Sequence, residues 1–550
     1  MELHKLKESR IILLLTILGC ISYLPFLGGV HLFDWDEVNF AEISREMIIL
    51  NDYTRVHVNF EPFWEKPPLF FWLQVICMKF IGINEYAARL PNAIIGILTL
   101  ITLFKCGTYY KNQKFGLTWA LVYWGSILPH LYFRSGIIDP WFNFFIFLAL
   151  FYYYKYLRLR LSDHIDKKIL IFSGLALGIA VITKGQVAIL LYGLCILVYY
   201  IATKFKHFPS IQSLFILLIT TLLSSGIWLG YETYLNGTWF METFTEYQIR
   251  LLTTHDAGHK GFFGYHFVVL LLGCFPASLF AILTAKKKYR PEAAQQKILF
   301  KLMFVLLAVV LVVFSIVQSK IVHYSSLAYF PLTFLAASGI SYLLKQENKL
   351  PALLNIGIIS LSILFALITG ILPVLGSNTD LLLPILEKDP FAVASLSAEV
   401  SWDCWRGLPA LVIVLTMLTY ILWSRNNKEK GIIALFIGTI IFVNSILFLQ
   451  VNNIEAYSQR ALIEFCKEHA DEDAYIKIIG TKSYAQLFYG KKKQDEGPNS
   501  NNQEWLLSSD KLDKDAYFIV KIHKALDLSK YPEVQELYRK NGFIFYKRTG

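Results

Sequence analysis

Long apolar runs separated by short polar loops dominate the chain. The runs lie near 11–27, 91–109, 115–133, 140–156, 169–182, 186–202, 211–230, 267–284, 299–317, 327–344, 354–375, 408–423 and 431–449. Because a bilayer core needs about 20 consecutive apolar residues in a helix, the pattern predicts about thirteen transmembrane helices. The chain is therefore expected to be an all-α polytopic membrane protein.

Composition agrees with this prediction. Of the 550 residues, 55% are hydrophobic and only 17% are charged, and the mean hydropathy is +0.47. The basic start MELHKLKESR leads into the first run without a small-residue cleavage site, which indicates an uncleaved first span. The seven cysteines are scattered, show no CxxC, and predict neither a disulfide framework nor a cysteine metal site.

One further apolar segment, 67–82, decides which side each loop faces. It is short, opens with Pro-Pro and contains Gln74 and Lys79, so it predicts an amphipathic helix lying on the membrane surface. Without it as a span, the basic clusters all fall on the cytoplasmic side, as the positive-inside rule requires. Those clusters are Lys5/Lys7/Arg10, Lys105/Lys111/Lys114, Arg158/Arg160/Lys167/Lys168, Lys204/Lys206, Lys286/Lys287/Lys288/Arg290, Lys345/Lys349 and Arg425/Lys428/Lys430.

The composition changes after about residue 450. Residues 1–450 form the predicted membrane domain, with outer loops at 31–90 and 231–266, and 451–550 form a small α/β domain outside the membrane. EAYSQRALIEFCKEHA and YPEVQELYRKNG predict helices, AYIKIIG, DAYFIVKI and FIFYKR predict strands, and KKKQDEGPNSNNQE predicts a loop. No nucleotide-binding motif is present, and the net charge of +11 resides in loops, so nucleic acid is not expected as a partner.

This topology gathers the polar motifs on the outer face. They are DWDE (34–37), WEKPP (64–68), RSGIIDP (134–140), ITKG (182–185), HDAGHK (255–260) and SKIVHY (319–324). Ionisable groups at the mouths of membrane spans are costly and are usually functional. The grouping therefore predicts a site at the outer face.

The acidic motif allows two interpretations. Asp36 and Glu37 either form the acidic first turn of a helix, where negative charge suits the helix dipole, or supply a general base. Asp34 is predicted to be the N-cap. Arg134 and Asp139 flank a turn, where a structural salt bridge and a functional role are equally compatible with the sequence.

The basic motifs suit a phosphate group. Outside the cytoplasmic membrane there is no ATP and there are no nucleotide sugars, so group transfer needs an activated substrate already in the bilayer, such as a polyprenyl phosphate. Lys66, Lys260 and Lys320 could stabilise its leaving phosphate, and Tyr324 offers a hydroxyl. His255 and His259 have a spacing that metal ligands use, with Glu65 as a conceivable oxygen ligand, but two unconnected histidines in a flexible loop are the more common case.

Ordered motifs carry a family resemblance over about residues 10–345. They are DWDEVNFAEISREMI, FEPFWEKPPLFFWL, NEYAARLPNAI, RSGIIDPWFNFF, ITKG, GHKGFFGYH and FSIVQSKIVHYSSLAYFPL. In these the chain resembles glycosyltransferases that use lipid-phosphate sugars, a group containing lipid A aminoarabinose transferases and protein O-mannosyltransferases. The resemblance is closest to the aminoarabinose branch. It implies the GT-C membrane fold, a polyprenyl-phosphate sugar donor and inversion at the anomeric carbon.

The resemblance also implies residue roles. Asp36 matches the catalytic aspartate with Glu37 as its partner, and Asp139 lies near the site. The expected donor-phosphate contacts are Lys66, Lys260, Lys184, Lys320, Tyr324 and Arg134. The expected ligands of a candidate divalent metal such as zinc are Glu65 with His255 or His259.

Two departures from the family pattern leave the substrates open. The family often has Arg where this chain has Asn39, and Pro where it has Gln186. The hypothesis is an enzyme in the cytoplasmic (inner) membrane, with its site and C-terminal domain on the periplasmic face among membrane lipids. It would transfer a sugar to lipid A or, alternatively, to a protein or glycan. A flippase for a lipid-linked sugar is the rival from another class, but the charges lie at span mouths rather than on broken helices at mid-membrane.

Overall fold

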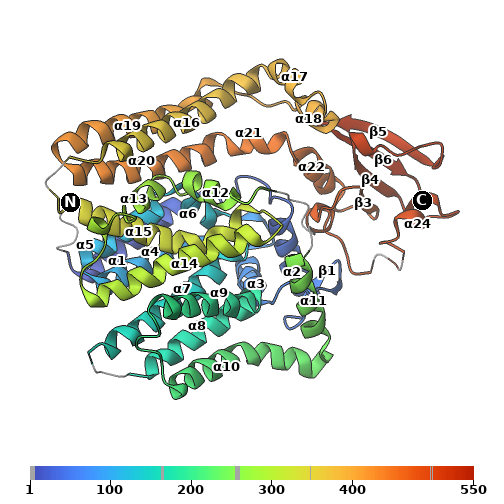
Figure 1. Cartoon of the computed structure of the whole chain (residues 1–550). Helices are drawn as coiled ribbons and strands as arrows, with labels where there is room; N and C mark the ends of the chain where they lie inside the picture. The colour runs from blue at the N-terminus through green and yellow to red at the C-terminus, as the bar shows by residue number, and fades with distance from the viewer. Residues whose placement is uncertain (1–5, 163–165, 254–260, 347–348, 496, 498) are drawn as a thin grey trace.

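The computed structural model shows a long helical bundle with a β-sheet at one end (Figure 1). It describes residues 6–162, 166–253, 261–346, 349–495, 497 and 499–550. The bundle helices are α1 (Glu8–Tyr23), α4 (Glu85–Tyr110), α5 (Gln113–Trp124), α6 (Ile127–Leu131), α7 (Asp139–Arg160), α8 (Lys168–Lys184), α9 (Val187–Ala202), α10 (Ile211–Asn236), α12 (Tyr265–Gly273), α13 (Ala277–Leu283), α14 (Ala294–Ile316), α15 (Tyr329–Leu343), α16 (Ala352–Ser377), α19 (Leu408–Asn426) and α20 (Lys428–Leu449).

The protein is a multi-pass membrane protein. Among the described residues, seven helices are long and apolar enough to cross a membrane, or up to nine if each of two sharply bent helix pairs is one span. This number is lower than the predicted thirteen because α1, α5, α8 and α9, which coincide with four predicted spans, have only 16, 12, 17 and 16 residues. Each predicted apolar run falls on one helix or, for 115–133 and 267–284, on successive helices.

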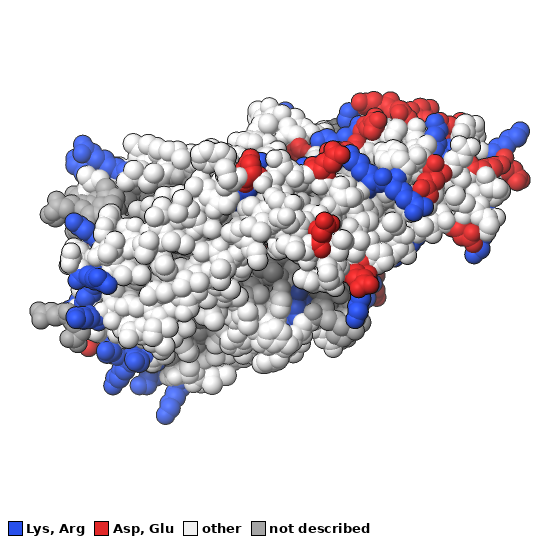
Figure 2. All heavy atoms as spheres, turned by 90° about the horizontal axis from the view of Figure 1, so that it is seen from above, with Lys and Arg blue, Asp and Glu red and all other residues white. Residues whose placement is uncertain are grey.

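Charge divides the two ends of the bundle as the loop pattern predicts. Figure 2 shows Lys and Arg gathered at the end opposite the sheet, a broad uncharged middle, and charges of both signs around the sheet. Contacts tie the basic loops together at their end: Lys114 pairs with Glu429 at 2.7 Å, and Lys428 donates to the Gln346 carbonyl at 2.6 Å.

Aromatic packing fills the interior of the bundle. Phe147 of α7 stacks on Phe330 of α15, with ring centroids 4.5 Å apart, and Trp119 of α5 lies edge-on to Phe147 at 5.6 Å. All three side chains are fully or almost fully buried. This packing fixes the helices whose ends carry the polar motifs.

Short helices and a β-hairpin cover the end of the bundle nearest the sheet. They are α2 (Asp36–Leu50), the hairpin β1 (His57–Val58) and β2 (Glu61–Pro62), α3 (Leu69–Ile81) and α11 (Trp239–Thr253). Helix α3 is a short apolar helix, in which Phe70 and Phe71 are fully buried whereas Phe80 is 86% exposed; its predicted amphipathic character stays a prediction. With 13 residues it is too short to span.

The C-terminal residues form a mixed four-stranded sheet of order β3-β4-β6-β5. Its elements are α21 (Val451–Ala456), α22 (Arg460–Glu468), β3 (Tyr475–Ile479), α23 (Ala485–Phe488), α24 (Gln503–Ser508), β4 (Ala516–Lys521), β5 (Val534–Lys540) and β6 (Phe543–Arg548). Strands β3 and β4 are parallel, and the other pairs are antiparallel. The strands expected at β3, β4 and β6 are confirmed.

The helix predicted over 531–542 is wrong, because these residues form β5. Asn541 and Gly542 follow β5 and have φ angles of +49° and +82°. Two consecutive positive φ angles are the geometry of the tight turn that joins strands in a hairpin, and Asn-Gly is the dipeptide that favours it. The apolar residues are spaced as in a helix, but the turn and the pairing with β6 make this segment a strand.

A long excursion between α16 and α19 reaches the sheet. It contains α17 (Leu383–Leu386) and α18 (Pro390–Ser395), and Phe391 of α18 lies edge-on to Phe543 of β6 at 5.2 Å. At the other edge, α21 continues from α20 toward the sheet (Figure 1). These two connections, and the contacts of residues 31–34 with the C-terminal region, hold the sheet against the end of the bundle that carries α2.

Candidate active site

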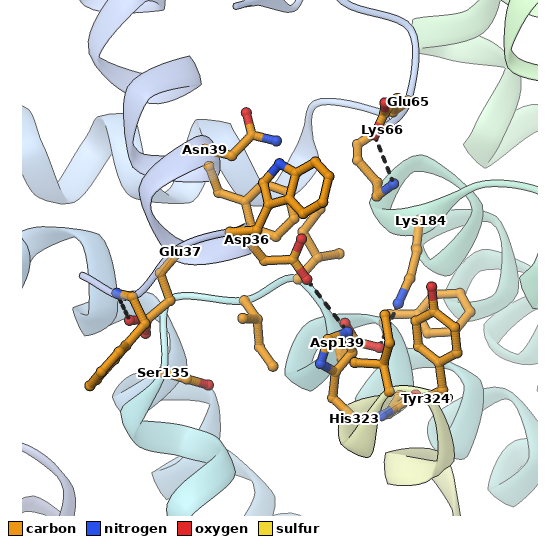
Figure 3. A pocket seen from close by; sticks show the side chains of 18 of the residues that line it. Asp36, Glu37, Asn39, Glu65, Lys66, Ser135, Asp139, Lys184, His323 and Tyr324 are labelled. Carbon is orange, nitrogen blue, oxygen red and sulfur yellow. Dashed lines mark hydrogen bonds and ion pairs between the residues drawn. The ribbon is translucent and has the colours of Figure 1, made fainter. Parts of the chain in front are cut away.

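A cavity of about 810 Å³ opens beside the start of α2. Most residues predicted to form the site line this cavity: Asp36, Glu37, Glu65, Lys66, Arg134, Asp139, Lys184 and Tyr324. They come from loops and helix ends distributed over the first 324 residues, and Figure 3 shows most of their side chains converging around Asp36. The cavity thus brings together residues of the predicted motifs DWDE, WEKPP, RSGIIDP, ITKG and SKIVHY, whereas HDAGHK (255–260) lies outside the described residues.

Asp36 presents a partly free carboxylate to the cavity. It is the first residue of α2, and its side chain is 41% exposed. Its Oδ2 lies 3.5 Å from Nε2 of His323, which belongs to the 3-10 helix η4 (Val322–Ala328). A carboxylate that contacts a histidine and has access to the cavity can orient an incoming group or accept its proton.

Asp139 and Lys184 form a tight ion pair beside Asp36. Asp139 begins α7, Lys184 ends α8, and Asp139 Oδ1 accepts from Lys184 Nζ at 2.6 Å. The start of α7 favours the negative charge through its helix dipole. The ammonium also lies 5.6 Å from the centroid of the Tyr324 ring, so a cation and a phenol ring lie together at this wall of the cavity.

Lys66 supplies a second cation from the loop that precedes α3. Its Nζ lies 3.9 Å from Glu65 Oε2 and 5.0 Å from the ring of Tyr247 in α11. An ion pair of this length is loose, and both side chains remain partly exposed. Lys66 and Lys184 therefore offer the cavity two ammonium groups, which suit an anionic group such as a phosphate.

Glu37 is held in a closed network. Its carboxylate pairs with Arg89 of α4, at 2.7 Å from Nη2 to Oε2, and also accepts the backbone N–H groups of Phe33 and Gly136. Burial alone would raise the pKa of the Glu37 carboxyl, but Arg89 and these hydrogen bonds hold that pKa below its usual range. A fully satisfied, ionised carboxylate of this kind fixes the start of α2 and is poorly suited to proton transfer.

Two cations predicted to contact the donor phosphate have other partners. Arg134 donates to the carbonyls of Ser22 and Pro25 and to Oδ1 of Asn444 at 2.5 Å. Lys320 donates to the carbonyls of Phe314, Ser315 and Val317, at 2.9, 2.8 and 2.5 Å. Arg134 thus ties α1 to α20, and Lys320 caps the end of α14, where helix carbonyls lack partners. A phosphate contact by Lys320 does not fit this geometry.

The predicted N-cap role of Asp34 is wrong. The residue before α2 is Trp35, and no side chain caps the helix. Asp34 instead accepts the hydroxyl of Ser483 and the backbone N–H of Tyr484. Its carboxylate is thereby used to attach the C-terminal region to the bundle.

The metal prediction stays a prediction. His255, His259 and Lys260 lie outside the described residues. Within the described ranges no group of three or more His, Cys, Asp and Glu side chains could hold a metal ion. Glu65, the remaining predicted ligand, lines the cavity beside Lys66.

Sequence reasoning missed several residues of the site. His323 stands inside the motif SKIVHY, and Arg89 inside NEYAARL, so both had a signal in the sequence. Lys482 also lines the cavity, although it belongs to the C-terminal region. Its only neighbours in sequence are polar loop residues, and nothing in the sequence places it beside α2.

Sequence and fold comparisons relate this helical membrane protein to known proteins. The sequence model of the dolichyl-phosphate-mannose-protein mannosyltransferase family matches residues 65–228. The fold is similar to that of ArnT from Cupriavidus metallidurans bound to undecaprenyl phosphate, with a TM-score of 0.74, 17% identity and 98% of each chain covered. The apo form of that protein gives a TM-score of 0.71 over the same share.

Curated relatives point in the same direction. One relative is the undecaprenyl phosphate-alpha-4-amino-4-deoxy-L-arabinose arabinosyl transferase of Pectobacterium atrosepticum. It is 28% identical to this chain over 342 residues, and this alignment covers 61% of this chain and 59% of the relative. The protein of the same name from Wigglesworthia glossinidia brevipalpis is 26% identical, over 64% of this chain and 61% of the relative. The alignments thus span about three fifths of these relatives. The chain is thus similar in sequence to these transferases, and its fold is similar to that of ArnT.

Proposed function

We propose that this protein is an inverting glycosyltransferase that moves a sugar from a polyprenyl phosphate to an acceptor at the outer face of the inner membrane. The observation that carries the proposal is the convergence of the Asp36 carboxylate with the ammonium groups of Lys66 and Lys184 in one cavity. A carboxylate for the incoming group and cations for a departing phosphate are what such a transfer needs.

The proposed step is a single displacement at the anomeric carbon. The bond between this carbon and the phosphate oxygen breaks, and its electron pair leaves with the polyprenyl phosphate, whose charge Lys66 and Lys184 stabilise. An acceptor oxygen forms the new bond from the opposite face. If the acceptor is a hydroxyl, its proton passes to Asp36, whereas an anionic phosphate acceptor carries no proton to remove and Asp36 serves to orient it.

Charge distribution supports the periplasmic side for this reaction. The basic loops lie at the end of the bundle opposite the sheet (Figure 2), whereas the cavity lies beside the start of α2 and is lined by Lys482 of the C-terminal region. Basic loops are retained in the cytoplasm. A lipid-linked donor fits this location because it brings its own activated phosphate. The names of the relatives make undecaprenyl phosphate-4-amino-4-deoxy-L-arabinose the first donor to test, with lipid A as the proposed acceptor. A protein or glycan hydroxyl is the alternative acceptor.

Reconstitution tests the proposal directly. Purified protein in liposomes is incubated with a radiolabelled undecaprenyl-phosphate sugar and lipid A, and the transfer of label is measured for the wild type and two variants. The variants are Asp36→Asn and, as a control, Asp380→Asn. Asp380 is an exposed residue in the segment after α16. Asp36→Asn is expected to lower kcat by about 100-fold or more, while the control keeps wild-type activity. Movement of the lipid between leaflets without transfer would instead identify a flippase. Full activity of Asp36→Asn would remove this carboxylate from the reaction.

A further inference from the structure

The C-terminal region contributes one wall of the cavity through the segment 482–484. This segment lies between β3 and α23, and Lys482 lines the cavity. Its two following residues, Ser483 and Tyr484, both donate hydrogen bonds to Asp34. Asp34 lies two positions before Asp36, so the segment is attached directly to the chain that carries the proposed catalytic carboxylate.

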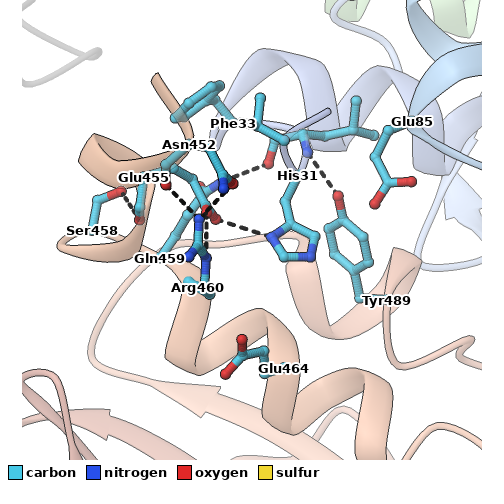
Figure 4. A network of polar contacts seen from close by, with 12 residues as sticks. His31, Phe33, Glu85, Asn452, Glu455, Ser458, Gln459, Arg460, Glu464 and Tyr489 are labelled. Atoms are coloured by element: carbon cyan, nitrogen blue, oxygen red, sulfur yellow. Dashed lines mark hydrogen bonds and ion pairs between the residues drawn. The ribbon is translucent and has the colours of Figure 1, made fainter. Parts of the chain in front are cut away.

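A second set of contacts fixes the position of this segment (Figure 4). Gln459 donates to the Leu32 carbonyl at 2.9 Å, and the Leu32 N–H donates to the Tyr489 hydroxyl at 2.7 Å. His31 pairs with Glu455 at 3.0 Å, and Glu455 is fully buried with Arg460 on its other oxygen. Residues 31–34 are therefore clamped by α21, α22 and α23, and this rigid support also fixes Lys482.

The ammonium of Lys482 lies on the ring of Trp35, 4.1 Å from its centroid. Trp35 directly precedes Asp36. In the part of the chain that the structure describes, no carboxylate lies within ion-pair distance of Lys482. A cation on an aromatic face keeps its charge and its hydrogen-bond donors for a third group. The cavity thus contains a positioned cation that has no ion-pair partner among the described residues.

Lys482 reaches Asp36 from a different element than the other cations do. Lys66 comes from the loop before α3, and Lys184 comes from α8 of the bundle. Both lie on the side of the cavity that holds Asp139, and Lys184 also lies near Tyr324. Lys482 comes from the C-terminal region and approaches through Trp35. In a displacement with inversion, the incoming and leaving groups stand on opposite faces of the attacked carbon, so a site for this reaction needs two separate anion contacts when both groups are anionic.

We infer that Lys482 binds an anionic group, such as a phosphate monoester, on the acceptor, and so makes the C-terminal region a determinant of acceptor choice. This inference rests on the proposed glycosyl transfer. Lys66 and Lys184 bind the donor phosphate, and Lys482 binds the anionic group of the acceptor. The ring of Trp35, the residue before Asp36, holds the ammonium in the cavity that Asp36 also lines.

The test compares steady-state kinetics of the full-length protein in liposomes for Lys482→Met, Lys482→Arg and Lys482→Glu. Met keeps the apolar stem over Trp35 and removes only the charge. The acceptor is lipid A with both phosphates, alongside the same glycolipid with one phosphate removed. The control is Lys511→Glu, an exposed lysine of the same region away from the cavity.

Removal of the charge is expected to raise the KM for the phosphorylated acceptor by about 10-fold, since a charge-assisted hydrogen bond is lost. Lys482→Glu raises it further, Lys482→Arg stays near wild type, and the KM for the donor and the thermal midpoint are unchanged in all three. Lys482→Met also loses the preference for the more phosphorylated glycolipid.

Other outcomes overturn the inference. An increase in the donor KM instead of the acceptor KM would place Lys482 on the donor side. Wild-type acceptor KM in Lys482→Met would show that the charge is not used. If the wild-type protein transfers sugar from no polyprenyl-phosphate donor to any acceptor, the proposed function itself fails. Transfer by the wild type with unaltered kinetics in the Lys482 variants rejects this inference alone.

Discussion

Asp36 Oδ2 lies 3.5 Å from His323 Nε2, and this contact joins the first turn of α2 to the helix η4. The two residues come from distant parts of the sequence, and both line the same cavity. His323 also lies next to Tyr324, with ring centroids 5.4 Å apart. The contact gives the Asp36 carboxylate a defined direction within the cavity.

Replacing His323 with Gln should therefore reduce turnover without weakening substrate binding. The carboxylate of Asp36 becomes free to rotate, and loss of orientation at a reacting group lowers kcat by about 10-fold. Steady-state kinetics should show unchanged KM values for donor and acceptor. His523→Gln, at an exposed position in the 3-10 helix η7 (Ile522–Lys524) that follows β4, serves as the control. Equal changes in kcat and KM, or none, would show that His323 does not position Asp36.

Lys66 and Lys320 should respond differently to the same substitution. Lys66→Met is expected to weaken binding of undecaprenyl phosphate by about 10-fold or more, because a charge-assisted contact with the phosphate is lost. Lys320→Met should leave that affinity unchanged and lower the stability by about 2 kcal/mol, because the carbonyls at the end of α14 lose their donor.

Two measurements separate these effects: binding of the lipid phosphate to the protein in detergent, and thermal unfolding of each variant. A loss of lipid affinity in Lys320→Met at unchanged stability would return Lys320 to the phosphate site. Unchanged affinity in Lys66→Met would remove Lys66 from it.

Much of the site could be predicted because every polar loop of a membrane protein lies on one of only two sides of the membrane. Once loop charges fix the sides, Asp36, Lys66, Asp139 and Lys184 must lie at the same surface. Their assembly in one cavity follows from that constraint together with the motifs around them. Sequence could not assign Lys320, because its use as a cap depends on carbonyls whose direction only the folded α14 defines.

Contacts between the C-terminal region and the bundle were beyond sequence reasoning. Lys482 and Ser483 lie about 450 positions from Trp35 and Asp34, and no periodicity links the two segments. The same limit explains Asp34, whose partners are in that distant loop rather than in its own helix. In β5, by contrast, the Asn541-Gly542 turn was a readable signal for a strand that the spacing of apolar residues concealed.

The pair of Asp139 and Lys184 should show strong coupling in a double-mutant cycle. Asp139→Asn leaves a largely buried ammonium without its partner, and Lys184→Met leaves a buried carboxylate, so each single variant should be clearly destabilised. The double variant should recover part of the loss, giving a coupling energy of about 2 kcal/mol. Thermal or denaturant unfolding in detergent provides the four stabilities.

The exposed pair Lys540 and Glu464, at 3.0 Å, is a matched control because its two side chains are about half exposed. Its coupling should not exceed about 1 kcal/mol. Equal coupling in the two cycles would mean that the Asp139–Lys184 pair is as well solvated as a surface pair.

Glu37→Gln should destabilise the protein at neutral pH and also change its response to acid. The buried Arg89 guanidinium loses its counter-charge, which costs about 3 kcal/mol, although Arg89 keeps its bonds to the carbonyls of Leu27 and His31. In the wild type the pKa of Glu37 is held below its usual range despite burial, mainly by Arg89. The ionised carboxylate therefore contributes stability above its ordinary pKa, and this contribution is lost as pH falls through the lowered value. The difference in unfolding free energy between wild type and variant, measured in detergent from pH 7 downward, should shrink in acid. A difference that is independent of pH would show that the charge of Glu37 does not support the start of α2.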